Sequence, residues 1–407
     1  MSLRSGLFAA LLAWLPKRNA AAVHTWPAFD DTALALVPEL EKSRLDKVYY
    51  LAAADVAAGP APAWGPKVEV LRKRSLRAVW AFLTSRHVFF THQCYTMRFP
   101  RNVVSVNLWH GMPIKKIGWM LPGRGGPCAQ YELATSDFWV PIIRAGMKPW
   151  GQVLVNGLPR YDRFSEPVSA GVKARLGGAA AACAKLAVWL PTYRQTVIGD
   201  VLRDGCDFAN VAQMPGFDAD RFDAWLAARN MVCVLKPHPL GPKPELRLRG
   251  NLWILDDAAL VAQGLTLYEL LGGSDVLLTD LSSVYVDYLL LNRPVIHTFA
   301  DREAYGATRG YTFDWTEEYF AGPAVATMAG VHSALEDVRA GRDTHAASRI
   351  RLRHLFHARP DSPATPSLLA QLGLGPAEAN ARRSARSGGG HEKTAGTGGN
   401  RPGFGGG

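Results

Sequence analysis

Cysteines are few and widely spaced in this chain of 407 residues. Their number is odd and no two form a CxxC pair, so neither a disulfide framework nor a zinc knuckle is predicted. This usage favours a reducing compartment. The five residues are Cys94, Cys128, Cys183, Cys206 and Cys233.

Long hydrophobic runs are also missing. No stretch approaches the roughly 18–20 apolar residues that a membrane-spanning helix requires. The longest N-terminal candidate runs from Leu7 to Leu15, between Arg4 and the basic pair Lys17 and Arg18. It lacks a small-residue cleavage site, which argues against a secretory signal. Residues 1–22 are therefore predicted to form either a helix packed on the first domain or a short interfacial membrane anchor.

Several catalytic signatures are absent as well. The chain has no GxxxxGK[ST], no GxGxxG after an apolar run, no HExxH and no GxSxG. Their absence argues against P-loop enzymes, common dehydrogenases, zincins and α/β-hydrolases. Asp218-Ala219-Asp220 matches a metal-binding DxD pattern, but no apolar strand precedes it, so a helix cap is the favoured interpretation. No metal ligand is assigned, and Mg²⁺ on a bound substrate stays open.

The composition is that of a folded protein with an excess of basic residues. Hydrophobic residues make up 48% and charged residues 20% of the chain. Lys and Arg number 46 against 35 Asp and Glu, a formal net charge of +11. This excess favours contact with phosphates in a nucleotide-linked substrate, on an anionic membrane or in a nucleic acid. Residues 376–407 are Gly- and Arg-rich with almost nothing apolar, which predicts a disordered tail.

Apolar strand-like runs alternate with helical stretches, a pattern that predicts an α/β fold of two doubly wound parallel sheets with a cleft between them. The first domain is expected over residues 23–165 and the second over 166–375. Predicted strands of the first domain are 23–29, 47–53, 68–71, 87–91, 103–109 and 152–157. Those of the second are 187–191, 232–236, 252–255, 276–279 and 295–298, with helices at 220–229, 267–272 and 283–291.

In doubly wound sheets, ligands bind beyond the carboxyl ends of the strands. The first polar cluster at such a place follows the predicted strand 103–109. It offers a potential base beside a turn and two cations. A histidine satisfied within its loop is the alternative interpretation. The cluster contains His110, Gly111, Met112, Pro113, Lys115 and Lys116.

A second cluster follows the predicted strand 276–279, which ends at Thr279. Asp280 or Ser282 can cap the next helix, while the remaining hydroxyl and the free amides form a cradle for an anion. Asp287 lies four residues after Ser283 and could receive a hydroxyl of a polyol or ribose. Simple capping with a solvated Asp287 is the alternative.

Three further clusters end predicted strands. Thr192 and Arg194 follow the strand 187–191, and His238 follows 232–236. Arg194 and His238 are expected at the same sheet edge as Ser282, where they could donate to a diphosphate. Arg160 ends the first half and is expected to face the cleft, with a turn closed by Asp162 as the alternative.

Six segments in chain order carry a family resemblance: LWHGMPIKKIG, NGLPRYD, LPTYR, KPHP, LLTDLSSVYVDYLLLNRPVIHTFADREAY and RGYTFDW. Together they resemble the signature series of the CDP-glycerol glycerophosphotransferases, which include teichoic acid polymerases and primases. The resemblance extends over about residues 23 to 322. It implies a GT-B fold with the donor in the cleft between two Rossmann-like domains.

The resemblance also implies an activity. Glycerol phosphate, or ribitol phosphate in relatives, would pass from a CDP-linked donor to a polyol-phosphate or lipid-linked acceptor, with release of CMP. The product would be a teichoic-acid-like or capsule polymer, made at the cytoplasmic face of the membrane. His110 would be the base that deprotonates the acceptor hydroxyl before it attacks the β-phosphorus.

The implied site has three parts. His110 and His238 are the catalytic histidines. The donor is expected to contact Gly111, Met112, Pro113, Arg160, Thr192, Arg194, Thr279, Ser282, Ser283 and Asp287. The acceptor is expected near Lys115, Lys116 and Asp31, although exposed acids in a turn are the alternative for Asp30 and Asp31. Anionic lipid headgroups could meet Arg4, Lys17, Arg18, Arg72, Lys73 and Arg74.

Two departures from the family leave the donor open: Met112 stands where Thr is usual and Leu281 where Tyr is usual. A GT-B glycosyltransferase that uses a nucleotide sugar is therefore an alternative within the enzymes. A nucleotide-binding or nucleic-acid-binding module without catalysis is an alternative outside them. No nucleic acid partner is expected, because the basic residues are not gathered in one stripe with aromatic platforms.

Overall fold

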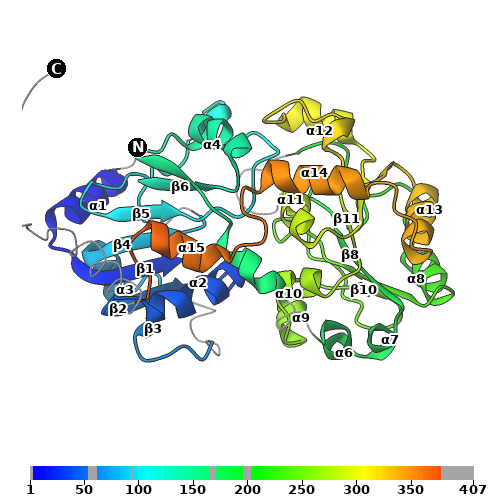
Figure 1. Cartoon of the computed structure of the whole chain (residues 1–407), viewed down its shortest axis with the longest axis horizontal. Coiled ribbons are helices and arrows are strands. Elements are labelled where there is room, and N and C mark those ends of the chain that lie inside the picture. Colours follow the sequence, from blue (N-terminus) through cyan, green and yellow to red (C-terminus); the bar gives the residue numbers. More distant parts are fainter. Residues whose placement is uncertain are drawn as a thin grey trace, which may run out of the picture.

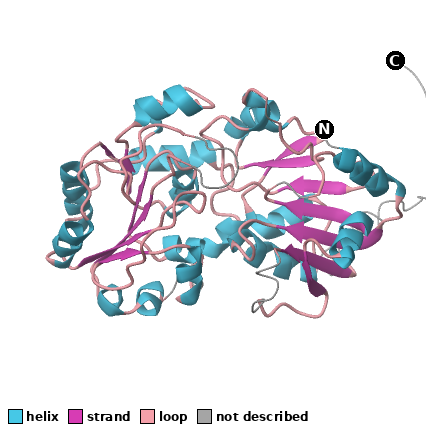
Figure 2. Ribbon diagram, turned by 180° about the vertical axis from the view of Figure 1, so that it is seen from behind, coloured by secondary structure: helices cyan, strands magenta, loops and turns pink. Residues whose placement is uncertain are grey.

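Two parallel α/β domains lie end to end in the computed structural model (Figure 1). The structure describes residues 3–53, 62–92, 95–123, 125–165, 171–195 and 203–376. The first sheet has the strand order β3-β2-β1-β4-β5-β6-β7 and the second β10-β9-β8-β11-β12-β13. Every strand pair in both sheets is parallel. Figure 2 shows the same two sheets with their helices from behind. The predicted α/β class is confirmed.

The strands of the first sheet are β1 (Arg18–His24), β2 (Lys47–Ala52), β3 (Val68–Arg72), β4 (Ser85–Phe90), β5 (Val104–Asn107), β6 (Tyr131–Ala134) and β7 (Gln152–Val155). Those of the second are β8 (Lys185–Leu190), β9 (Met231–Leu235), β10 (Leu252–Ile254), β11 (Val276–Thr279), β12 (Val295–Thr298) and β13 (Ala324–Val325).

Helices of the first domain are α1 (Leu3–Trp14), α2 (Asp31–Lys42), α3 (Leu76–Thr84) and α4 (Val140–Met147), with short turns η1 (Gly118–Met120), η2 (Asp137–Trp139) and η3 (Pro159–Phe164). The rest are α6 (Val172–Leu176), α7 (Gly178–Ala181), α8 (Ala219–Ala227), α9 (Asp257–Ala262), α10 (Leu267–Gly272), α11 (Val284–Tyr288), η4 (Leu289–Leu291), α12 (Arg302–Arg309), η5 (Glu317–Tyr319), α13 (Met328–Arg339), α14 (Ala346–Phe356) and α15 (Ala364–Gln371).

The central strand β1 explains how the first sheet is covered on both faces. Its consecutive residues Ala20, Ala21, Ala22 and Val23 are all buried, as is typical of a strand inside a parallel sheet. Alternate side chains enter two different clusters: Ala21 and Val23 pack with α2, and Ala22 packs with α3. The carboxyl ends of the parallel strands all point to one edge, which lies toward the second domain.

The N-terminal helix α1 packs on the first domain, and contact of this helix with a membrane stays a prediction. Leu12 is fully buried in the cluster that contains Phe82, and the ring of Phe8 stacks on Tyr95 at 5.4 Å. Trp14 at the end of the helix is 82% exposed. None of the helices that the structure describes is long and apolar enough to cross a membrane.

The end of the chain returns to the first domain. Helix α14 lies along the second domain, and α15 packs against α2 and η3 of the first (Figure 1). The carboxylate of Asp162 accepts the backbone N–H groups of Ala364 and Thr365 at 2.7 and 2.8 Å. The second domain was predicted to cover residues 166–375, but its last helix, α15, lies on the first domain. The boundary near residue 165 stays a prediction, and the predicted tail from residue 377 onward lies outside the described residues.

The predicted strand boundaries needed correction in places. β1 begins at Arg18 and ends at His24 instead of covering 23–29, because Asp30 caps α2 by accepting the Ala33 N–H at 3.0 Å. β5 ends at Asn107, since Trp109 has a φ of 60° and turns the chain. The predicted helix 283–291 is α11 followed by η4. β6 and β13 were not predicted.

Candidate active site

A cavity of about 450 Å³ lies between the two domains, within the size range of small-molecule sites. The carboxyl ends of strands from both sheets line it, as expected for doubly wound folds. Most of the predicted site residues meet here: Asp31, His110, Gly111, Met112, Pro113, Lys115, Arg160, Thr192, His238, Ser282, Ser283 and Asp287.

His110 faces this cavity from the loop after β5. Its Nδ1 lies 3.3 Å from the carbonyl oxygen of Thr91. Because a carbonyl only accepts, Nδ1 carries the hydrogen, and a neutral ring then keeps a free lone pair on Nε2. The ring stacks on His92 at 4.2 Å. Its surroundings, first desolvation and then the charge of Arg160, lower the pKa of His110 to about 4, so the ring is neutral at pH 7.

Gly111 brings the His110 loop against the second domain. A Cβ at this position would lie 2.2 Å from Oγ of Ser283 and 3.2 Å from Nη2 of Arg160. Its φ of +133° is also one that side-chain-bearing residues rarely adopt. The sequence therefore needs glycine here so that the base, a hydroxyl and a guanidinium converge. Met112, the next residue, is fully buried in the hydrophobic core.

Arg160 reaches the cavity from η3 and is fixed by Asp287. Nη2 of Arg160 donates to Asp287 at 2.6 Å, Tyr161 donates to the other carboxylate oxygen at 2.6 Å, and Tyr268 also donates to this group. Asp287 is fully buried. These contacts give Asp287 a positioning role, and its predicted contact with a polyol or ribose hydroxyl stays a prediction. Asp162 caps α15 and does not pair with Arg160.

His238 complements His110 across the cavity. The backbone N–H of Leu240 donates to Nδ1 of His238 at 3.1 Å, so Nδ1 is the acceptor and a neutral ring carries its hydrogen on Nε2. Burial, and next the charge of Lys115, lower the pKa of His238 to about 3. The cavity thus holds one imidazole that can accept a proton and one that can donate a hydrogen bond.

Thr192 and Lys115 complete the polar lining predicted on this side. The Thr192 N–H and hydroxyl both donate to Asp280, at 3.1 and 2.8 Å. Lys115 lies with its ammonium 5.5 Å from the ring centroid of Tyr305. Burial lowers the pKa of Lys115 to about 8, which leaves it mostly charged at pH 7. Oγ of Ser282 accepts the N–H of Val284 at 3.4 Å.

Arg194 does not face the cavity, contrary to its predicted role as a donor to diphosphate. Its guanidinium makes a bidentate ion pair with Asp301, at 2.6 and 2.7 Å, and lies 3.0 Å from Asp280. It is 2% exposed. Two buried carboxylates require this cation, which is why it is not free for a ligand. Thr279 is also outside the cavity lining, and its hydroxyl donates to the Leu190 carbonyl.

The loop after His110 pairs with the second domain. The Lys116 N–H donates to Gly310 at 3.2 Å, and the Thr312 N–H donates to Ile114 at 2.9 Å. Lys115 lies on this bridge and lines the cavity, whereas Lys116 is exposed and does not. The predicted contact of Lys116 with an acceptor is therefore not supported by its position.

Asp31 bridges the domains instead of lying in an exposed turn. Its carboxylate accepts the hydroxyl of Thr266 and the N–H of Tyr268, the latter at 3.0 Å. The neighbouring Asp30 caps α2, lines the cavity, and has a pKa raised to about 6 by burial. Asp31 therefore has a role in domain pairing, and its predicted contact with the acceptor stays a prediction.

Two cavity residues were not predicted, although their positions in the sequence could have identified them. His92 follows β4 directly and so satisfies the strand-end rule that identified His110. Arg309 is the first residue of the segment RGYTFDW and the last of α12, and it lines the cavity. Its charge contributes to the lowered pKa of Lys115. Lys236 also lines the cavity, where it pairs with Asp257 at 2.7 Å.

In the described part of the chain, no three acidic, histidine or cysteine side chains converge as the ligands of a metal ion would. Asp218 caps α8 by accepting the N–H of Arg221 at 2.9 Å, which confirms the cap interpretation of the DxD pattern. We assign no step of the chemistry to a metal held by the protein.

Residues 17–370 match the family described as CDP-glycerol:poly(glycerophosphate) glycerophosphotransferase. The chain belongs to this family. It is 24% identical over 262 residues to the teichoic acid ribitol-phosphate polymerase of Staphylococcus aureus, covering 60% of this chain and 43% of that one. It is 26% identical over 276 residues to a teichoic acid glycerol-phosphate transferase of the same species, covering 62% and 65%. The chain thus spans less than two thirds of the length of either relative.

The fold of this glycerophosphotransferase family member is also that of a solved relative. A structure of the wall teichoic acid polymerase TagF superimposes with a TM-score of 0.69 at 17% identity, over 92% of this chain and 91% of that one. The likeness confirms the predicted GT-B-like arrangement, in which two Rossmann-like domains face a shared cleft.

Proposed function

We propose that this chain transfers glycerol phosphate or ribitol phosphate from a CDP-linked donor to a hydroxyl of a polyol-phosphate or lipid-linked acceptor, with release of CMP. The observation that carries the proposal is the pair of complementary imidazoles in one cleft. His110 has a free lone pair on Nε2, and His238 has a hydrogen on Nε2. One ring can take a proton from the acceptor while the other donates to a phosphate oxygen.

The reaction follows from these groups. Nε2 of His110 removes the proton of the acceptor hydroxyl, and the oxygen attacks the β-phosphorus of the donor. The bond from the β-phosphorus to the bridging oxygen breaks, and CMP leaves with the electron pair. The resulting imidazolium returns its proton to solvent. The neutral state of His110 at pH 7 is what this step requires.

Cations around the cavity would stabilise the donor diphosphate and the charge that develops on it. Arg160 is held in place by Asp287, and Lys115 and Arg309 come from the paired interdomain segments. Ser283 lies beside Gly111 and can donate its hydroxyl. Desolvation between the domains strengthens each of these interactions relative to bulk water.

The relatives support this donor class. The names of the two relatives above include ribitol phosphate and glycerol phosphate, and a TagF structure was soaked with CDPG. The choice between the two polyols is open, because Met112 and Leu281 are both buried apolar side chains. The glycosyltransferase alternative has the same fold in its favour but no observation specific to a sugar.

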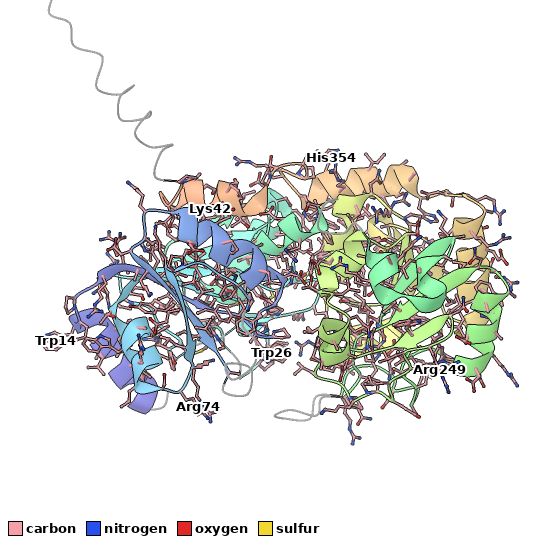
Figure 3. All side chains as sticks on the ribbon, turned by 90° about the horizontal axis from the view of Figure 1, so that it is seen from below. Trp14, Trp26, Lys42, Arg74, Arg249 and His354 are labelled. Carbon is pink, nitrogen blue, oxygen red and sulfur yellow. The ribbon has the colours of Figure 1, made fainter. Side chains whose placement is uncertain are left out.

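A peripheral location on the cytoplasmic membrane face fits a lipid-linked acceptor. Helices α1 and α3 are in contact and expose Trp14, Leu76 and Trp80. Trp14 lies at the end of the first domain that is far from the second (Figure 3). Of the basic residues predicted to meet headgroups, Lys17 is occupied, because its ammonium donates to the Leu12 and Leu83 carbonyls. We therefore expect contact through the aromatic side chains and the exposed Arg18.

The function is tested by measuring CMP release from CDP-glycerol, CDP-ribitol and a panel of nucleotide sugars, each with a glycerol-phosphate oligomer as acceptor. Release from a CDP-polyol that requires the acceptor is the expected result, and it names the donor. If neither CDP-polyol gives CMP and a nucleotide sugar is turned over, the chain would be assigned to glycosyl transfer instead.

Gly111→Ala is expected to lower kcat for CMP release by about 10–100-fold, because the added Cβ pushes the His110 loop away from Ser283 and Arg160. Gly375→Ala is the matched control, since a Cβ there meets nothing within 4 Å and its φ is not in the left-handed region. Wild-type kcat in Gly111→Ala would show that the close approach is not needed for turnover.

A further inference from the structure

A row of basic and aromatic side chains leads away from His110 along the carboxyl edge of the first sheet. β1, β4 and β5 are neighbours, and their carboxyl ends carry His24, His92 and His110. Lys73 follows β3 and extends past the end of β2, so that its Nζ lies 2.8 Å from Nε2 of His24. β1 and β5 are two strand spacings apart, which separates their backbones by ~10 Å.

The charge of Lys73 is not neutralised within this row. Nδ1 of His24 donates to the Leu51 carbonyl at 3.1 Å, so Nε2 is the acceptor for Lys73. Burial, followed by the charge of Lys73, lowers the pKa of His24 to about 4, which keeps its ring neutral at pH 7. The acid on β3, Glu69, pairs with Arg77 and Lys47 instead. A half-buried ammonium held by a neutral imidazole still has donors for an external anion.

His92 lies beside the base His110, after β4, the strand between β1 and β5. Oγ1 of Thr91 accepts the Trp26 N–H at 3.1 Å and also hydrogen-bonds with Nδ1 of His92 at 3.1 Å. The same ring stacks on His110, and the indole of Trp26 meets its edge at 5.2 Å. Both His92 and Trp26 line the cavity.

We propose that these four residues, Lys73, His24, His92 and Trp26, form an acceptor row that binds the phosphodiester preceding the reactive hydroxyl of the acceptor. The proposal rests on the proposed function and assigns the acceptor to this edge of the first domain. A phosphodiester carries one negative charge and takes charge-assisted hydrogen bonds. The row supplies an ammonium and an imidazole ring, with an aromatic surface for the polyol carbons.

The row also has a direction. Arg72 and Arg74 flank Lys73 and are exposed, so further phosphates of a longer acceptor would meet more cations beyond it. In Figure 3, Trp26 and Arg74 both lie on the lower edge of the first domain, with Trp26 nearer to the second domain. An acceptor would therefore enter past Arg74 and end with its hydroxyl at His110.

The test compares the full-length wild type with Lys73→Met in two measurements. The first is a fluorescence titration that measures binding of a lipid-free glycerol-phosphate oligomer in the absence of donor. The second is the KM for that oligomer in the CMP assay. Loss of a charge-assisted hydrogen bond is expected to weaken binding and raise this KM by about tenfold or more, with no change in the KM for the donor. The effect should be smaller for an acceptor with a single phosphate.

Two variants serve as controls. Lys73→Arg keeps the charge and should recover most of the oligomer affinity. Lys47→Met removes the same charge from the amino end of β2, at the opposite edge of the sheet, and should bind like the wild type. The titration is repeated with vesicles that contain a lipid-linked acceptor of one glycerol-phosphate unit. Weaker binding of either ligand by Lys73→Met than by the wild type supports the acceptor row. The ligand that is affected identifies the source of the phosphate.

Equal affinity of wild type and Lys73→Met for both ligands would overturn the acceptor row. That outcome is separate from failure of the proposed function, since the titration needs no turnover: a chain that binds the oligomer through Lys73 but releases no CMP from either CDP-polyol would keep the row and lose the transferase assignment.

Discussion

His110→Ala is expected to reduce the rate of CMP release by about 10²–10⁴-fold, the usual effect of removing a general base. Nε2 of this ring has a lone pair, and no hydrogen bond from a donor in the described residues reaches it. Donor affinity should change little, because the diphosphate is expected to be held by Arg160, Lys115 and His238. Rates at saturating donor and acceptor and a donor titration measure the two effects.

His354→Ala is the control for this substitution. His354 is exposed on α14, away from the cavity lining (Figure 3). It should retain the wild-type rate. Normal turnover in His110→Ala would show that another group removes the acceptor proton, and a proportional loss of donor affinity would make His110 a binding residue.

Arg194→Ala is expected to lower stability by about 3–5 kcal/mol, the cost of leaving buried charges without a partner. Asp280 and Asp301 are both nearly inaccessible, and Arg194 contacts both. The first thermal transition of the folded protein should therefore move to a lower temperature. Any loss of donor binding should be explained by the unfolded fraction, since the guanidinium does not line the cavity.

The matched control is Arg229→Ala, which removes an arginine from a partly exposed pair with Glu336. A partly exposed pair of that kind contributes little, so the transition should move far less than in Arg194→Ala. Arg194→Ala could instead be as stable as Arg229→Ala and bind the donor weakly. That result would support the predicted contact of Arg194 with the donor diphosphate and contradict a purely structural role.

The fold and the convergence of the site could be predicted because they depend on local rules. Buried strand runs and the strand-end position predict that His110, His238 and Ser283 lie at one cleft, and all three line the cavity. The same rules missed β6, because the buried Glu132 makes its sequence look polar; burial raises the pKa of this carboxyl well above its usual value.

The roles of individual charged residues could not be predicted in the same way. Arg194 and Arg160 both follow strands, yet one is enclosed by two carboxylates and the other projects into the cavity. What separates them is the position of Asp301 and Asp287, which lie 107 and 127 residues further along the chain. Contacts of such long range are set by packing of the domains, which spacing along the sequence does not show.

The central claim is that a neutral His110 removes the acceptor proton, and the pH dependence of kcat/KM tests it most directly, since this quantity reports ionisations of the free enzyme. Because the pKa of His110 is lowered to about 4, the base is present throughout the neutral range and is lost only as the pH falls through that value. We expect kcat/KM to stay level from pH 7 to about pH 5 and to fall about tenfold per pH unit below 4. An acid limb near 6 that disappears in Asp30→Asn would make that carboxylate, whose pKa burial raises to about 6, the base and contradict the account.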